Sequence, residues 1–154
     1  MKNIIKNRDF ILFSIIIFGV IVVGFANPYF VKPSSLSDVL TDTSILIILA
    51  LSQMIVILIR AIDLSVASNL ALSGMLISLL STVYPELPVV FFILLSCVIG
   101  TLLGVLNGVS IAILKVPFIV TTLGTLSIYR GLIYFVSDGK QVYSHEFSEN
   151  FLAL

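Results

Sequence analysis

The stretch that decides the fold runs from Val89 to Leu114 and reads VVFFILLSCVIGTLLGVLNGVSIAIL, without one charged residue. A bilayer span needs about 20 consecutive apolar residues, so this stretch can cross a membrane with some tilt. Backbone polar groups in hydrocarbon must be satisfied within the segment, which a helix achieves. Strands of a membrane barrel would instead alternate apolar and polar residues. The sequence therefore predicts a transmembrane helix here.

Further apolar runs lie on both sides of this stretch, and each is continuous rather than alternating. They are Phe10 to Ala26, Ser44 to Ile59, Leu64 to Val83 and Val116 to Val136. The run from Ser44 is slightly short but would gain length if its helix began near Leu40 or continued past Arg60. The run from Val116 is the weakest, because it contains Pro117, several hydroxyl residues and Arg130. We expect an all-α, polytopic transmembrane helix bundle of about five spans.

The composition excludes most soluble classes of protein. Of the 154 residues, 59% are hydrophobic and 10% are charged, and the mean hydropathy is +1.22. Soluble domains carry about 25% charged residues, so an ordinary cytosolic enzyme, a disordered chain and a disulfide-stapled secreted domain are excluded. The net charge of zero gives no basic footprint for nucleic acid. Cys97 is expected to be an inert buried thiol, and His145 alone cannot build a metal site.

Basic residues predict the orientation in the membrane, because they are enriched on the cytoplasmic side. Those before the first span and at inward-facing boundaries are Lys2, Lys6, Arg8, Arg60 and Lys115. They predict a cytoplasmic N-terminus, with the loop from Asn27 to Thr43, the turn from Tyr84 to Pro88 and the tail from Ser137 outside. Residues 1–26 could also be a cleaved signal peptide, but their apolar run exceeds the usual length of about 7–15 residues.

Small residues recur at helical spacing in two of the spans. One set is Ser96, Gly100, Gly104 and Gly108, and a looser set is Ala67, Ala71, Gly74, Ser78 and Ser81. Membrane helices associate through close packing of small residues, so these faces are expected to be packing seams. A substrate path lined by bare backbone is the alternative.

Polar residues within or near the bilayer are Gln53, Arg60, Asp63, Asn107 and Arg130. A charge at the centre of a span costs about 2.5–3.5 kcal/mol on insertion scales. Arg60 and Asp63 share one face of an unbroken helix and could form a gate. Alternatively, Arg60 anchors the span and Asp63 caps the next one. Asn107 is expected to form an interhelical hydrogen bond, and Arg130 to reach the outer interface or a watery cavity.

The last span begins near Pro117, which can occupy the first position of a helix without losing a hydrogen bond. Its hydroxyl-rich face is formed by Thr121, Thr122, Thr125 and Ser127. This face suits contact with another helix, or the hydroxyl groups of a passing sugar. The sequence lacks a metalloprotease motif, a P-loop and a serine nucleophile elbow, so we do not expect an enzyme.

Three stretches resemble the permease subunits of bacterial ABC sugar importers of the ribose type, a branch that includes ribose, xylose, rhamnose and autoinducer-2 permeases. RAIDLSVASNLALSG (Arg60 to Gly74) is similar to the family's GIDLSVGS pattern, and GVLNGVSI (Gly104 to Ile111) to its GxxNG pattern. KVPFIVTTLGTLSIYRG (Lys115 to Gly131) is similar to its IPxFIVTLGTxxIYRG run. The resemblance implies that the sensitive positions are Arg60, Asp63, Ser65, Gly74, Asn107, Gly108, Pro117, Thr121, Gly124, Thr125, Tyr129, Arg130 and Gly131.

Within this branch, the segment from Asp42 to Asn69 is most similar to rhamnose permeases. Members are about twice as long and carry in their second half a stretch resembling GGNxxAAxxSGI, which is thought to dock on an ATP-binding subunit. The resemblance therefore implies that residues 1–154 are the N-terminal half of a permease of the bacterial cytoplasmic membrane.

The resemblance also implies a set of partners. They are an ATP-binding subunit, a soluble sugar-binding protein, a second permease copy and the lipid bilayer. The chain itself is expected to bind no cofactor, since ATP is used by the separate subunit. A non-transporting membrane fragment or scaffold, and a passive channel, remain as alternatives.

Overall fold

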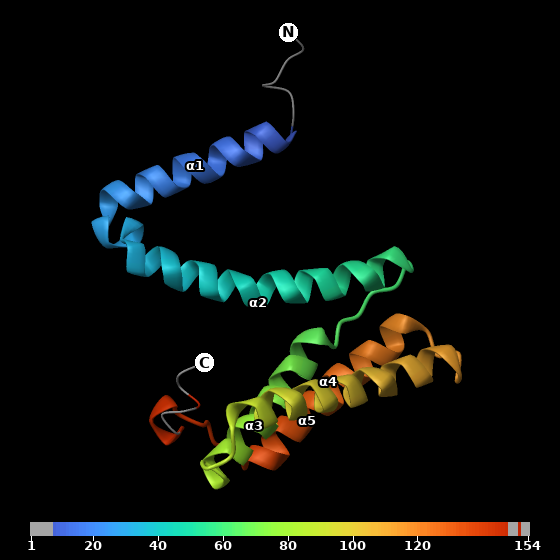
Figure 1. Ribbon diagram of the computed structural model, residues 1–154. Coiled ribbons are helices and arrows are strands. Elements are labelled where there is room, and N and C mark those ends of the chain that lie inside the picture. The colour runs from blue at the N-terminus through green and yellow to red at the C-terminus, as the bar shows by residue number, and fades with distance from the viewer. Residues whose placement is uncertain (1–7, 148–150, 152–154) are drawn as a thin grey trace. The chain divides into compact units, whose positions relative to one another are not determined.

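The computed structural model describes residues 8–147 and residue 151, and every regular element in this part of the chain is helical (Figure 1). The long helices are α1 (Arg8–Ala26), α2 (Pro33–Leu58), α3 (Val66–Val83), α4 (Val89–Ala112) and α5 (Phe118–Ser137). Short 3₁₀ turns follow α1 and α5, namely η2 (Pro28–Val31) and η3 (Ser144–Glu146). All five long helices are long and apolar enough to span a membrane, which confirms the predicted fold class.

Most helix ends lie within about two residues of the predicted spans, the range over which such boundaries vary. The start of α2 is the exception, because residues up to Thr43 were expected to form a loop and the helix begins at Pro33. Proline has no N–H to lose in the first turn and its fixed φ suits a helix start. Hydroxyls in the first half of α2 bond to the helix backbone, as Thr41 does to the Ser37 carbonyl at 3.0 Å.

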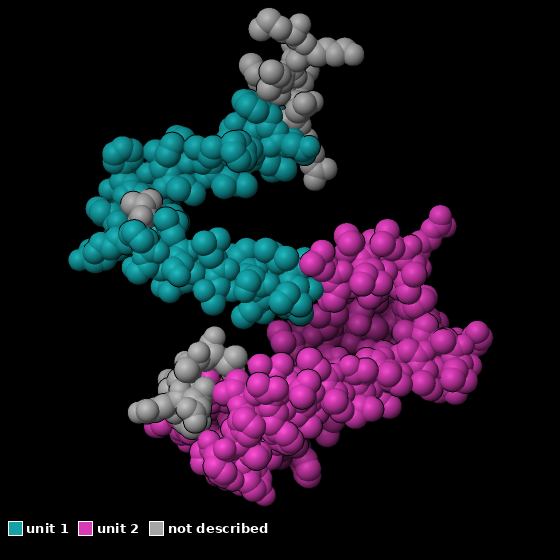
Figure 2. Space-filling model, in the orientation of Figure 1, with its two compact units in different colours: residues 1–50 teal, residues 51–154 magenta. Residues whose placement is uncertain are grey.

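The chain divides into two compact units, residues 1–50 and 51–154 (Figure 2). In the first unit, Asn27 directly follows α1 and caps η2, where its side chain accepts a hydrogen bond from the Tyr29 N–H at 3.1 Å. The Lys32 ammonium lies 3.6 Å from the centre of the Tyr29 ring. None of the residues 9–26 of α1 or 33–58 of α2 is buried, so both helices present apolar side chains all round. Lys2 and Lys6, on which the predicted orientation partly rests, lie outside the described residues.

In the second unit, α3 packs against both α4 and α5. The turns between successive helices are short, so α4 runs antiparallel to the other two (Figure 1). Most of the buried side chains are small or polar: Ala61, Ser65, Ser68, Ser73, Ser81, Asn107, Thr121, Thr122 and Ser137, beside Leu72, Ile77, Phe92 and Tyr129. Lipid is as apolar as leucine, so such a bundle is held by close approach and interhelical hydrogen bonds. Asn69, for example, donates from Nδ2 to the Gly100 carbonyl at 3.3 Å.

The predicted seam on α4 is realised only in part. A Cβ at Gly100 would lie 3.8 Å from the Asn69 side chain, whereas a Cβ at Gly104 or Gly108 would meet no atom within 4 Å. Gly74 of the looser seam on α3 is equally open. The expected burial of Cys97 is wrong, because α4 turns this thiol outward to an exposed position.

Candidate functional site

The seven residues between α2 and α3 are not helical, so Arg60 and Asp63 do not share a helix face as an unbroken helix would require. Arg60 has a φ of 59°, in the left-handed region. The Arg60 N–H donates to the Ile57 carbonyl at 2.8 Å, and the Ala61 N–H donates to the Val56 carbonyl at 3.1 Å. This pair of bonds is the Schellman motif, which satisfies the last carbonyls of a helix. Helix α2 therefore ends in a defined cap, with Arg60 as its left-handed residue.

Asp63 fixes the start of α3. Its Oδ1 accepts hydrogen bonds from the Ser65 N–H at 2.8 Å and from the Ser65 hydroxyl at 2.7 Å. The Asp63 carbonyl accepts a further bond from Gln53 Nε2 at 2.9 Å. A carboxylate at this end also interacts favourably with the helix dipole. Asp63 thus serves the N-terminus of α3 as the capping interpretation expected, while the cap position itself is Ser65.

Asn107 of α4 joins the same cluster. Its Nδ2 donates to Ser65 Oγ at 2.7 Å, which is the expected interhelical hydrogen bond. A hydroxyl has a single proton to donate, and Ser65 gives that proton to Asp63, so it can only accept from Asn107. The NH₂ group of the Asn107 amide, rather than its oxygen, therefore faces Ser65. We name Asp63, Ser65 and Asn107 the polar junction; Ser65 is 0% exposed and Asn107 is 5% exposed.

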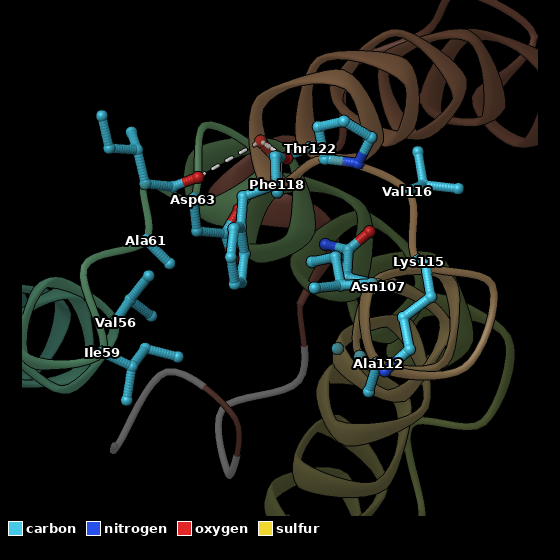
Figure 3. A pocket seen from close by; sticks show the side chains of 15 residues that line it. Val56, Ile59, Ala61, Asp63, Asn107, Ala112, Lys115, Val116, Phe118 and Thr122 are labelled. Carbon is cyan, nitrogen blue, oxygen red and sulfur yellow. Dashed lines mark hydrogen bonds between the residues drawn. The ribbon is translucent and has the colours of Figure 1, made fainter.

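The start of α5 contacts the segment that comes just before the junction in the chain. The Thr122 hydroxyl lies 3.5 Å from the Ile62 carbonyl and 2.9 Å from the Phe118 carbonyl of its own helix, as the dashed lines at Thr122 in Figure 3 mark. The Thr125 hydroxyl bonds to the Thr121 carbonyl at 3.1 Å. Thr121 and Thr122 are buried, so much of the hydroxyl-rich face lies against protein.

Three buried polar atoms of the second unit have no hydrogen-bond partner among the described residues. They are Gln53 Oε1, Asn107 Oδ1 and Thr121 Oγ1. Buried polar atoms are nearly always paired, so such atoms mark places where water, a ligand or further protein supplies the partner.

An open cavity of about 630 Å³ lies beside the junction, at the end of the bundle where α2 and α4 stop and α5 begins. Figure 3 shows Val56 and Ile59 on one side, with Asn107, Ala112 and Lys115 on the other. Gly104 and Gly108 contribute bare backbone to its wall, which is otherwise mostly apolar. The part of α4 expected to pack on a helix therefore faces this cavity instead.

The remaining candidate positions are dispersed. Arg60 borders an adjoining hollow of about 250 Å³, and Arg130 borders a hollow of about 330 Å³ between α3 and α5. The Tyr129 hydroxyl donates to the Leu103 carbonyl at 2.7 Å and ties α5 to α4. A Cβ at Gly124 or Gly131 would meet no atom within 4 Å.

Sequence reasoning did not find the contact between Gln53 and the Asp63 carbonyl or the place of Lys115 in the cavity wall. The signal for Lys115 was present, because a lysine two residues before Pro117 marks the turn between two spans. Lys115, like Arg60, has a left-handed backbone, with a φ of 57°.

Comparisons with known proteins show the family of the chain. Residues 35–152 match the family model described as branched-chain amino acid transport system / permease component. The chain is 37% identical over 144 residues to the autoinducer 2 import system permease protein of Enterobacter sp. (strain 638), covering 92% of this chain and 41% of that protein. It is 38% identical over 149 residues to the ribose import permease protein of Haemophilus influenzae, covering 97% of this chain and 44% of that protein.

No solved structure gives a significant match. The chain spans less than half the length of the curated relatives described above. Those relatives are transport permeases, and with the five apolar helices they identify a multi-pass protein of the bacterial inner membrane. The chain therefore belongs to the permease family that this model describes, in the ribose-type branch of ABC permeases.

Proposed function

We propose that the chain forms part of the permease of an ABC importer that carries a monosaccharide across the inner membrane, with rhamnose as the best candidate. One observation carries this proposal. The three stretches that resemble sugar permeases are far apart in the sequence, yet they contact one another. Ser65 of the first bonds to Asn107 of the second at the polar junction, and the Thr122 hydroxyl of the third lies 3.5 Å from the Ile62 carbonyl of the first. All three stretches therefore lie in the packed unit formed by residues 51–154, rather than on helices that do not contact one another.

The choice of solute rests on sequence. The segment from Asp42 to Asn69 resembles rhamnose permeases, while the two relatives are named for autoinducer 2 and ribose. The unpartnered Gln53, Asn107 and Thr121 atoms would suit water or a polar solute passing close to the junction. The chain supplies part of the pathway wall and no covalent chemistry.

The proposal includes the partners that the resemblance implies. A soluble sugar-binding protein delivers the solute, a second permease copy completes the pathway, and two ATP-binding subunits drive the change between outward-facing and inward-facing states. The N-terminus lies in the cytoplasm, because Arg60 and Lys115 then fall at inward-facing ends.

The test is uptake of labelled rhamnose, ribose and autoinducer 2 into membrane vesicles. The vesicles contain the chain together with the binding protein, ATP-binding subunit and any remaining permease segment from the same genome. We expect ATP-dependent rhamnose uptake that falls with Asn107→Leu and persists with Lys140→Gln, since Lys140 lies at the other end of the bundle beside Asp138. Absence of uptake for all three solutes would refute the proposal, and uptake of ribose alone would refute the choice of rhamnose.

A non-transporting membrane fragment is the second candidate. Such a fragment would share the packing of α3 with α4 and α5 and would differ only in moving no solute. Liposomes containing this chain alone distinguish the possibilities. Energy-independent flux of rhamnose indicates a passive channel, whereas lack of flux here combined with lack of uptake in the complete vesicles indicates a fragment.

A further inference from the structure

The cavity beside the polar junction has a chemistry that the proposed transport function does not use. Its wall is mostly apolar, with Val56, Ile59, Ile111 and Phe118 among the lining side chains. The adjoining hollow near Arg60 shares Ala61, Ile62, Pro117 and Phe118 with it, so the two hollows have a common wall, and together we name them the depression. All of these residues belong to the unit formed by residues 51–154.

Two cations border this depression, Lys115 on the cavity and Arg60 on the adjoining hollow. Both residues are exposed, and neither forms an ion pair within the part of the chain that the structure describes. The carboxylate that lines the cavity is Asp63, which is half-buried and already bonded to Ser65. The other acidic residues described in this unit, Glu86, Asp138 and Glu146, follow α3 or α5 and so lie beyond the opposite helix ends. The mouth of the depression is therefore cationic.

A monosaccharide does not fit this chemistry well. Each sugar hydroxyl needs a hydrogen-bond partner, and an unpaired buried polar group is costly. The polar atoms on the wall are few, and Asp63 Oδ1, Asn107 Nδ2 and the Thr122 hydroxyl are already bonded to protein. Asn107 Oδ1 is unpaired, but one acceptor cannot satisfy the several hydroxyls of a sugar. An apolar tail joined to an anionic head matches both the wall and the mouth.

We propose that the depression binds an anionic phospholipid, with an acyl chain in the apolar cavity and the phosphate between Arg60 and Lys115. The position supports this occupant, because both cations lie just beyond the ends of membrane-spanning helices, at the level of lipid headgroups. Basic pockets between membrane helices are known to hold anionic headgroups. The volume of about 630 Å³ lies in the range of about 300–1,000 Å³ that is typical of small-molecule sites.

The test is native mass spectrometry of the purified full chain released from nanodiscs that contain phosphatidylglycerol and phosphatidylcholine. We expect phosphatidylglycerol to be retained in preference to phosphatidylcholine. Neutralising either cation, by Arg60→Gln or Lys115→Gln, should weaken phosphatidylglycerol binding about fivefold, and the double variant about 25-fold. Lys115→Arg keeps the charge and should keep the binding.

Two further variants separate the cavity from general surface charge. Lys140→Gln removes an exposed lysine that pairs with Asp138 and should leave lipid binding unchanged. Gly104→Leu places a side chain in open space on the cavity wall and should displace the acyl chain without loss of helical circular dichroism. If Gly104→Leu loses helical signal, Gly108→Ala serves as a smaller obstruction at the same wall.

Several results would overturn the proposal. They are equal retention of phosphatidylcholine, full phosphatidylglycerol binding by the Arg60→Gln/Lys115→Gln variant, and displacement of the lipid by millimolar inorganic phosphate alone. A dimer that carries no lipid would also overturn it, by showing that a second copy covers this face. The transport of any solute plays no part in these measurements, so failure of the transport proposal leaves their outcome interpretable.

Discussion

The polar junction makes a quantitative prediction about Ser65. Its hydroxyl donates to Asp63 and accepts from Asn107, each at 2.7 Å, and the side chain is fully buried. Ser65→Ala removes the bond to Asp63, worth about 1 kcal/mol. It also leaves the buried Asn107 amide without a partner, which costs about 1–3 kcal/mol. We expect the free energy of unfolding to fall by about 2–4 kcal/mol in total.

A double-mutant cycle with Asn107→Leu tests the reasoning behind this number. Asn107→Leu alone removes one interhelical bond together with the amide that made it, so it should cost about 1 kcal/mol. In that background Ser65→Ala strands no amide and should cost only about 1 kcal/mol more. The two changes should therefore couple by about 1–3 kcal/mol, measured by reversible unfolding in mixed micelles with increasing SDS.

Ser81 is the matched control for Ser65. It lies on α3, whose cap position is Ser65, and is 1% exposed, but its hydroxyl bonds to the Ser78 carbonyl of α3 itself. Ser81→Ala should therefore change the free energy of unfolding far less than Ser65→Ala does. Equal losses for the two serines, or strictly additive effects of Ser65→Ala and Asn107→Leu, would refute the junction as described.

Three further changes test separate contacts, each by the same unfolding measurement. Asp63→Ala should cost about 1–2 kcal/mol by removing the acceptor at the start of α3, and Asp63→Asn should recover most of that loss; equal losses would show that the oxygen does not matter. Tyr129→Phe should cost about 1 kcal/mol, because it removes only the bond to the Leu103 carbonyl, and an unchanged stability would contradict that bond. Arg60→Gly should raise stability by about 1 kcal/mol because glycine adopts the left-handed backbone without strain, and a loss of stability would place Arg60 in a contact beyond those described.

The helices of this chain could be predicted because a continuous apolar run can satisfy its backbone hydrogen bonds in lipid only as a helix. The uncharged stretch from Val89 illustrates this, since α4 begins at that residue and ends at Ala112. The start of α2 could not be predicted in the same way, because Pro33 is compatible both with a turn and with the first position of a helix. What distinguishes the two is the backbone that follows, where hydroxyls such as that of Thr41 bond within the helix.

The candidate site was predictable residue by residue but not as a site. Asp63 and Asn107 were conspicuous as polar side chains in apolar surroundings, and each has the local role expected of it. Their meeting through Ser65 depends on packing between residues 42 positions apart, which no local pattern encodes. Likewise, equal spacing of Gly100, Gly104 and Gly108 could not reveal that only Gly100 meets a neighbouring side chain.

The small, hydroxyl-bearing interior of the three-helix unit reverses the usual pattern of mutational tolerance. In a water-soluble protein the most damaging change is a polar residue placed inside, but here the inside already consists largely of serine and threonine. Added bulk is more damaging at these buried hydroxyls, because side chains such as Ser65 and Ser81, which are 0% and 1% exposed, have no room for added methylene groups. A serine-to-leucine change within the bundle should therefore impair the protein more than leucine-to-serine on its outer face, so volume rather than polarity should govern which variants of this chain survive.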